Sequence, residues 1–169
     1  IGAVPVYVLE ECHAPPVVAS SQALGLMVKE HFADAKDKHL GAAIEYAPKN
    51  QTDVEQWASD LLDRYQPKAV ISAERIGPGK EGILYSATGI PFYDPTSPSA
   101  KGVIDIAAVV AEATKRGILT LGIGDHGNEI GFGAIRDAVV AAMPKGEYLG
   151  TTTPCDIVFP AMMSNWGCY

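Results

Sequence analysis

Cysteine is scarce in this sequence, and long apolar runs are absent. The three cysteines, Cys12, Cys155 and Cys168, have no metal-binding spacing, and an odd number does not describe a disulfide framework. We therefore expect free thiols in a reducing compartment, either the cytoplasm or the mitochondrial matrix. No apolar run reaches the ~20 residues that a membrane-spanning helix needs, which argues against a membrane protein.

Basic residues are outnumbered by acidic ones. The chain has 13 Lys and Arg against 20 Asp and Glu, giving a formal net charge of −7. Without a basic stripe to offset phosphate repulsion, a nucleic-acid partner is not expected. An acidic balance suits a site for a cation, and we expect the partner to be a small-molecule substrate.

What the sequence does contain is a regular alternation of strand-like and helix-like segments. At 169 residues, the chain has the length of one domain with a sizeable core. Repeated β-α-β units with short connections predict the α/β class, with a mainly parallel sheet and helices on both faces in a three-layer sandwich. We expect strands over 4–9, 42–46, 69–73, 118–123 and 156–160, and helices over 20–32, 53–65, 103–116 and 132–143. The stretch 77–101, rich in Gly, Pro, Ser and Thr, is predicted to be a long functional loop.

A glycine-rich loop follows the strand expected at 118–123. Its Asp125 and Glu129 carry carboxylates and its Asn128 an amide, and these are hard oxygen ligands at the strand end where open α/β sheets keep their sites. Because no Cys/His cluster is present, the sequence predicts Mg²⁺, Mn²⁺ or Ca²⁺ near Asp125 and Glu129, with Asn128 in support. Glycine allows close approach of a ligand, so Gly124 and Gly127 are candidates for substrate binding.

The loop histidine, His126, has three open interpretations. It can shuttle protons near neutral pH, ligate a metal, or be an ordinary solvated residue. The segment 122–127 also satisfies the dinucleotide pattern G-x-G-x-x-G. That match is weak, because the acid inside the loop would meet a pyrophosphate of like charge.

A second pair of polar residues, Glu74 and Arg75, follows the strand expected at 69–73. If this strand and the one at 118–123 are neighbours, Glu74 and Arg75 converge with Asp125 and Glu129 on one crevice. Glu74 is then a candidate general acid or base, and Arg75 a candidate clamp for a substrate carboxylate or a group that orients Glu74. The alternative is an ordinary surface ion pair.

Three motifs together resemble a known family. They are Ala73-Glu74-Arg75 before a Gly/Pro-rich loop, the block Gly-Asp-x-Gly-Asn-Glu-Ile-Gly-x-Gly over 124–133, and Ser-Asn-Trp-Gly over 164–167. Over roughly 66–169 the chain closely resembles the C-terminal catalytic domain of D-glutamate cyclases. The resemblance implies cyclisation of D-glutamate to 5-oxo-D-proline with loss of water, in an α/β fold whose acidic cavity holds a divalent cation, and it makes Asn165 a candidate substrate contact.

The chain departs from the family pattern at two places. His126 stands where such sequences usually have glycine, and the segment 85–89 lacks an arginine expected there. The predicted function is therefore a metal-assisted lyase or cyclase acting on a small amino or carboxylic acid. The alternatives are a metal-dependent hydrolase of lactams, amides or phosphate esters, and a non-catalytic sensor of small ligands or nucleotides. From its two ends we expect a processed or truncated part of a longer protein, completed by a second chain or segment or by a homo-oligomer.

Overall fold

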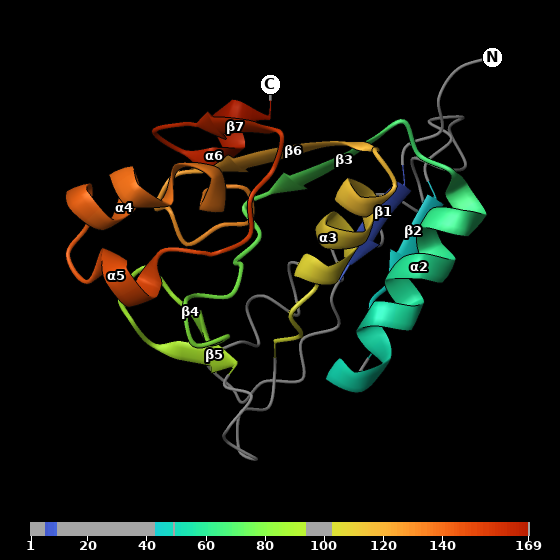
Figure 1. The fold of residues 1–169 in the computed structure, drawn as a ribbon, viewed down its shortest axis with the longest axis horizontal. Coiled ribbons are helices and arrows are strands. Elements are labelled where there is room, and N and C mark those ends of the chain that lie inside the picture. The colour runs from blue at the N-terminus through green and yellow to red at the C-terminus, as the bar shows by residue number, and fades with distance from the viewer. Residues whose placement is uncertain (1–5, 10–42, 49, 94–102, 169) are drawn as a thin grey trace.

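The computed structural model describes residues 6–9, 43–48, 50–93 and 103–168. Figure 1 shows how the helices and strands are arranged. The strands are β1 (Val6–Leu9), β2 (Ala43–Tyr46), β3 (Ala69–Ala73), β4 (Leu84–Tyr85), β5 (Pro91–Tyr93), β6 (Leu119–Gly124) and β7 (Ile157–Pro160). The helices are η2 (Gln51–Asp53), α2 (Val54–Tyr65), α3 (Ala107–Lys115), η3 (Gly133–Ile135), α4 (Arg136–Ala142), α5 (Gly146–Leu149) and α6 (Ser164–Gly167).

The sheet at the centre of the described residues is three-stranded and parallel. Its order is β3-β6-β7, with Ile71 opposite Leu121 and Leu121 opposite Ile157. The strands β1 and β2 form a second parallel pair, and only the short pair of β4 and β5 is antiparallel among the described strands. The predicted α/β class with a mainly parallel sheet is confirmed. Since β3 and β6 are parallel neighbours, the loops after them leave the sheet at the same edge.

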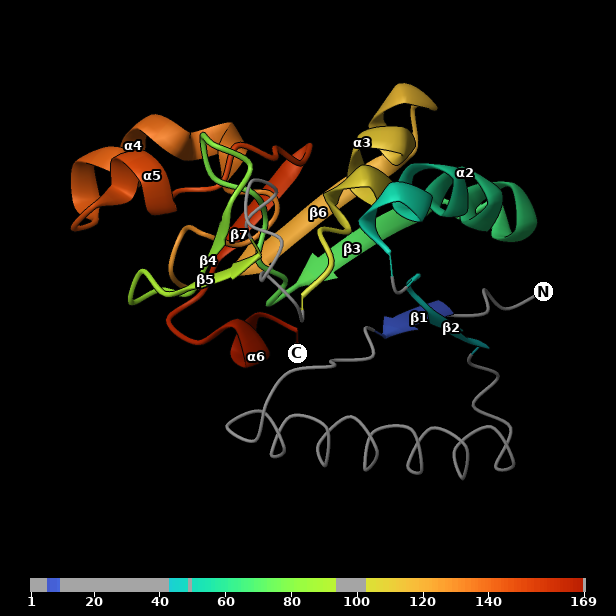
Figure 2. The same ribbon diagram turned by 90° about the horizontal axis from the view of Figure 1, so that it is seen from below.

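Helices lie on both sides of this sheet (Figure 2). On one side, α2 and α3 pack against each other and against Val70 of β3. On the other side, α6 contacts β6 and β7, and its Gly167 lies close to Ile123 and Phe159. The core between α2 and α3 consists of the buried residues Ala58, Leu61, Leu62, Val109 and Ala113.

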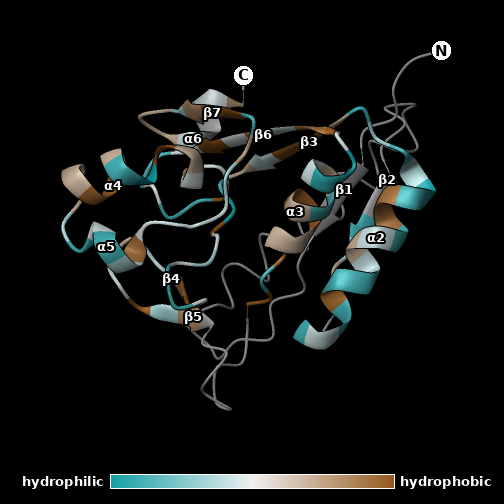
Figure 3. Ribbon diagram, in the orientation of Figure 1, coloured by the Kyte–Doolittle hydropathy of each residue, from teal (hydrophilic) through white to brown (hydrophobic). Residues whose placement is uncertain are grey.

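The apolar periodicity of the sequence explains α2. Its buried residues fall on one helical face, and Figure 3 shows hydrophilic and hydrophobic segments alternating along it. Trp57 is partly buried and packs against the edge of the core. The helix ends at Tyr65, and the next residue, Gln66, adopts a left-handed conformation before Pro67. The predicted helix over 53–65 is thus confirmed to within one residue.

The helix predicted over 103–116 begins later, at Ala107. A turn at Asp105 delays it: the Asp105 carboxylate accepts a hydrogen bond from the Ala107 N–H at 2.9 Å. Gln51 bonds both the N–H and the C=O of Asp105, at 2.8 and 2.9 Å, and so holds this backbone outside the helix. At the other end Gly117 has a φ of 69°, the left-handed conformation expected after a helix.

The predicted helix over 132–143 is divided in two. Ala134 and Ile135 donate to the carbonyls three residues before them, which makes the short 3₁₀ turn η3, and α4 starts only at Arg136. The turn forms because Gly131 and Gly133 both donate to the Thr153 carbonyl, which pins this segment to the chain before β7. Helix α5 was not predicted.

The long loop predicted over 77–101 contains the β4–β5 pair. Several sequence predictions lie outside the described residues: the helix over 20–32, Cys12, the end of the long loop at 94–101, and the side chain of Asn165. In the part of the chain that the structure describes, no helix is both long and apolar enough to cross a membrane.

Candidate functional site

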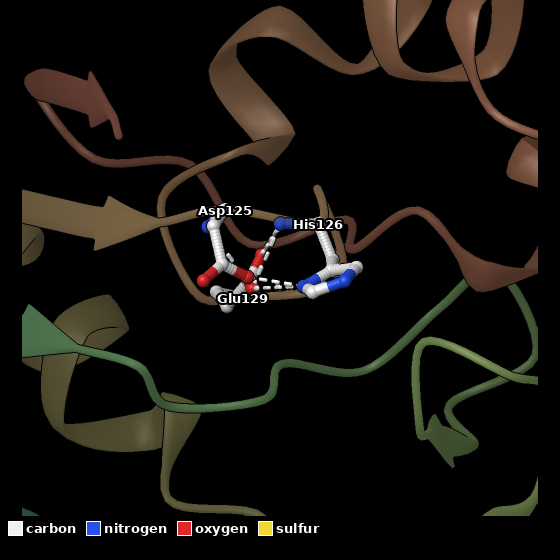
Figure 4. A group of neighbouring side chains, drawn as sticks. All are labelled: Asp125, His126 and Glu129. Carbon is white, nitrogen blue, oxygen red and sulfur yellow. Dashed lines mark hydrogen bonds and ion pairs between the residues drawn. The ribbon is translucent and has the colours of Figure 1, made fainter. Parts of the chain in front are cut away.

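The loop after β6 gathers three ionisable side chains. Ligand atoms of Asp125, His126 and Glu129 all lie within 4.8 Å of one another, and Figure 4 shows the three side chains pointing toward a common centre. Their exposure differs greatly: the side chain of Glu129 is 3% exposed, that of Asp125 14% and that of His126 54%. The cluster therefore has a buried acid at its base and an accessible imidazole at its mouth.

Glu129 braces the loop from within. Its carboxylate accepts hydrogen bonds from the backbone N–H groups of Asp125 at 3.2 Å and of His126 at 3.0 Å. Burial raises the pKa of Glu129, the two N–H groups oppose that rise, and the negative charge of Asp125 adds to it.

Asp125 is held from two sides. One carboxylate oxygen interacts with His126 Nδ1, and the other accepts a hydrogen bond from the Ser164 N–H at 3.1 Å. Burial alone would raise the pKa of Asp125, but the Ser164 N–H, the His126 imidazole and the Ser164 side chain together lower it. These contacts favour the ionised form of Asp125.

His126 adds a nitrogen donor to the two acids. Its Nδ1 faces Asp125 and lies 3.9 Å from a Glu129 carboxylate oxygen. The exposed ring can accept or release a proton at the mouth of the cluster or supply a metal ligand, so both functional interpretations of His126 have a geometric basis.

Two glycines make this compact loop sterically feasible. A Cβ on Gly124 would lie 2.8 Å from the Glu129 carboxylate and 2.7 Å from the Phe132 ring. Gly127 has a φ of 83°, and a Cβ there would meet Val139 of α4 at 2.6 Å. The glycines thus let the loop fold over its own acid, and their predicted contact with a substrate stays a prediction.

Glu74 leaves the sheet beside this loop. Its N–H donates to the Ile123 carbonyl at 3.0 Å, which continues the ladder between β3 and β6 up to the point where Asp125 begins the loop. Glu74 is exposed, lies outside the three-residue cluster and has a φ of 55°. A left-handed backbone costs a residue with a Cβ roughly 1–2 kcal/mol, and such strain is concentrated at functional sites.

Arg75 points to another element. Its guanidinium donates to the Ile104 carbonyl at 2.6 Å, and its charge acts on Asp105, whose pKa burial raises and Arg75 lowers. The Arg75 backbone carbonyl accepts a hydrogen bond from the Ile130 N–H at 2.7 Å. Arg75 therefore ties the end of β3 to the segment before α3, and its predicted contact with a substrate carboxylate stays a prediction.

Asn128 is buried and joins the loop to its surroundings. Its amide nitrogen donates to the Tyr85 carbonyl of β4 at 2.7 Å, and its backbone carbonyl accepts from Gly77 at 2.9 Å. These bonds fix the loop against the segments after β3. The support that Asn128 was expected to give a cation also stays a prediction.

Ser164 is a neighbour of the cluster that the sequence did not single out. It opens the Ser-Asn-Trp-Gly segment, of which only Asn165 was named as a candidate, and its N–H holds Asp125 across 39 residues of sequence. The signal available in the sequence was its membership of that motif.

The side chains of Cys155 and Cys168 are free thiols, and burial raises the pKa of Cys155.

These features define an α/β domain whose polar cluster sits at the carboxyl edge of a parallel sheet. A family model described as "D-glutamate cyclase-like, C-terminal" matches residues 1–169. The chain belongs to this family, which confirms the resemblance that its motifs indicate.

A curated relative gives a second comparison. It is the human protein named "D-glutamate cyclase, mitochondrial", which is 29% identical to this chain over 102 residues. The match covers 59% of this chain and 15% of the human protein, so the chain corresponds to a small part of that relative's length.

Proposed function

We propose that this chain carries the catalytic site of a cation-dependent lyase that closes a glutamate-like amino acid into a five-membered lactam with loss of water. The observation that carries the proposal is the Asp125–His126–Glu129 cluster at the carboxyl edge of the sheet, in a chain of the D-glutamate cyclase-like family. The D-glutamate substrate comes from the name of the family and of its human relative.

The donor set fits a divalent cation. Asp125 offers an anionic carboxylate, His126 an imidazole nitrogen and Glu129 a second carboxylate, all within reach of one centre. Mixed carboxylate and imidazole donors favour Mn²⁺ over Mg²⁺ or Ca²⁺, which prefer oxygen alone. When bound, such an ion polarises a carboxylate and stabilises negative charge on its oxygen.

Lactam closure needs groups that move protons and hold the substrate in a reactive geometry. The α-amine must lose a proton before it attacks the γ-carbon, and the departing oxygen must gain protons to leave as water. Glu74, which is exposed beside the cluster, is the group that we propose for these transfers, and His126 is the alternative where it does not bind the ion. Holding amine and carboxylate together can contribute ~7–11 kcal/mol in favourable cases.

The test is a product screen with metal-stripped protein resupplied with Mn²⁺, Mg²⁺ or Ca²⁺. D-glutamate, L-glutamate and the two 5-oxoprolines are incubated separately, and the products are identified by mass spectrometry. We expect metal-dependent interconversion of one enantiomer pair, and its loss in Asp125→Asn. Turnover that is indifferent to chelation and to Asp125→Asn would contradict the proposed site.

A further inference from the structure

The Ser164 hydroxyl is a buried polar group beside the Asp125 carboxylate. Ser164 is 1% exposed, and its Oγ forms no well-aligned hydrogen bond among the described residues, although its side chain is close enough to Asp125 to lower the pKa of that carboxylate. A buried hydroxyl that is left poorly paired lowers the stability of the fold. An atom of this kind therefore marks a place where water, an ion or a ligand atom completes the contacts.

Ser164 is held firmly against Asp125. Its N–H binds one oxygen of the Asp125 carboxylate at 3.1 Å, while His126 faces the other oxygen. The segment before it is fixed to the end of β6, because the Ala161 N–H donates to the Gly124 carbonyl at 2.9 Å. Ser164 thus lies beside the Asp125 carboxylate, and the effect of its side chain on the Asp125 pKa shows that the side chain is near that carboxylate as well.

The chemistry of a hydroxyl suits this position. Two carboxylates already concentrate negative charge in the cluster, and a third acid would repel them. A serine hydroxyl offers a neutral oxygen lone pair to a hard cation and still keeps a proton for a neighbouring oxygen acceptor. Ser164 can therefore add a donor to the site without adding charge.

We propose that the Ser164 hydroxyl is an oxygen ligand of the cation site formed by Asp125, His126 and Glu129. This inference rests on the proposed function for the presence of the cation. It assigns to the first residue of the Ser-Asn-Trp-Gly segment a direct role in binding the ion. It also gives Oγ a contact of good geometry, which it lacks among the described residues.

The experiment measures binding of Mn²⁺ and Cd²⁺ to metal-stripped protein by calorimetry, without substrate. Ser164→Ala should weaken Mn²⁺ binding about 10- to 100-fold, a loss typical of residues that support metal sites. Ser164→Cys replaces a hard oxygen with a soft sulfur, so it should weaken Mn²⁺ binding while binding Cd²⁺ at least about tenfold tighter than the wild type does. Ser164→Thr, which keeps the hydroxyl, should recover much of the Mn²⁺ affinity.

Ser72→Ala is the matched control, since Ser72 is a buried serine of β3 outside the cluster. It should leave Mn²⁺ affinity unchanged, and circular dichroism should show that each variant is folded. Equal Mn²⁺ affinity in Ser164→Ala and wild type would overturn the inference. So would an unchanged preference between Cd²⁺ and Mn²⁺ in Ser164→Cys, because the backbone N–H bond survives every one of these substitutions.

The result also separates this inference from the function on which it rests. If wild-type protein binds Mn²⁺ and Asp125→Asn weakens that binding while Ser164→Ala does not, the role of Ser164 is refuted and the cation site stands. If wild-type protein binds none of the divalent ions, both proposals are overturned together.

Discussion

Two carboxylates four residues apart have opposite environments in this protein. Burial raises the pKa of Glu129, whereas hydrogen bonds and the imidazole of His126 lower the pKa of Asp125 despite its burial. Pairs of acids whose surroundings drive their pKa values apart commonly divide two roles between them. For the proposed cation site, we expect Asp125 to be the main charged ligand and Glu129 to act mainly as the brace of the loop.

Substitution at each acid should separate these roles. Asp125→Asn should weaken Mn²⁺ binding at least about tenfold, since it removes the anionic ligand, and should leave the unfolding free energy nearly unchanged. Glu129→Gln should chiefly lower the unfolding free energy, by about 1–3 kcal/mol, because an amide nitrogen in place of one oxygen leaves a buried polar group poorly paired. Calorimetry and urea unfolding measure the two effects. If both variants lose the same Mn²⁺ affinity and the same unfolding free energy, the division of roles is refuted.

Glu74 is the second residue whose role can be isolated. If it transfers protons, Glu74→Gln should lower kcat by about 10²–10⁴-fold while metal affinity and stability stay close to wild type. If it is a metal ligand, Mn²⁺ affinity should fall, and excess metal should partly restore the rate. Steady-state kinetics across a range of Mn²⁺ concentrations distinguishes these outcomes. Unchanged activity would contradict the catalytic role and leave His126 as the candidate.

At the scale of elements, the site depends on how closely the loop after β6 returns over its own strand. A Cβ on Gly122 of β6 would lie 2.7 Å from the Gly131 Cα and 2.5 Å from the Ile130 carbonyl oxygen. Gly131 itself has a φ of 110°. Because neither position has a side chain, the two backbone segments can pack directly against each other. Residues 124–131 therefore form a tight loop that returns to β6.

The segment before α3 makes stability depend on pH through Asp105. Burial raises the pKa of Asp105 above its ordinary 3.8, although the Ala107 N–H and Arg75 oppose the rise. Because the folded protein binds this proton more tightly than the unfolded chain, the stabilisation is fully present below pH 3.8 and is lost as pH rises through the folded pKa. Asp105→Asn removes this loss and should keep the hydrogen bond to Ala107.

We therefore expect Asp105→Asn to gain stability relative to wild type as pH rises from about 4 toward neutrality. Within the affected window the difference changes by at most about 1.4 kcal/mol per pH unit. Urea unfolding of both proteins at several pH values measures it. Comparing the two proteins removes the contribution of the other carboxylates to the pH dependence of stability. Many of these carboxylates have lowered pKa values, so their contribution changes with pH in the opposite direction. A difference that does not vary with pH would show that Asp105 titrates alike in both states.

At the scale of the whole molecule, one sheet face carries exposed apolar side chains. Ile71, Leu119, Ile157 and Phe159 all project from the face that α6 covers in part, and each is exposed. Contiguous apolar surface of this kind commonly marks an interaction site. It supports the expectation that a second chain, another segment or a second copy completes this side of the fold.

Sedimentation equilibrium tests whether a second copy of this chain covers that face. The protein should associate at micromolar concentrations, and Phe159→Ser should weaken the association about tenfold or more by removing apolar contact area. Ile90→Ser is the control, because Ile90 is equally exposed but lies beside β5. A wild-type protein that stays monomeric throughout would contradict self-association through this face.

Local sequence patterns predicted many of the strands and helices and the strand ends that carry the candidate site. The strand over 69–73 is confirmed at every residue, and α2 begins one residue after its predicted start. The neighbouring β3 and β6 bring Glu74 and Asp125 to one edge, as the strand-end argument required. The Arg75 guanidinium donates to the Ile104 carbonyl, and its predicted place in the crevice stays a prediction. That partner could not be foreseen, because it depends on where the segment before α3 lies in space.

The sequence by itself determined most of the longer strands and helices among the described residues, and that the glycine-rich acidic loop follows a buried strand. These properties depend on periodicity, helix and strand preferences and glycine position, all of which act over a few residues. Only the tertiary structure decided which atoms meet: Glu129 turns onto the backbone of its own loop, and Ser164 reaches Asp125 across 39 residues. Contacts of that kind depend on strand order, register and packing, which no local stretch of sequence contains.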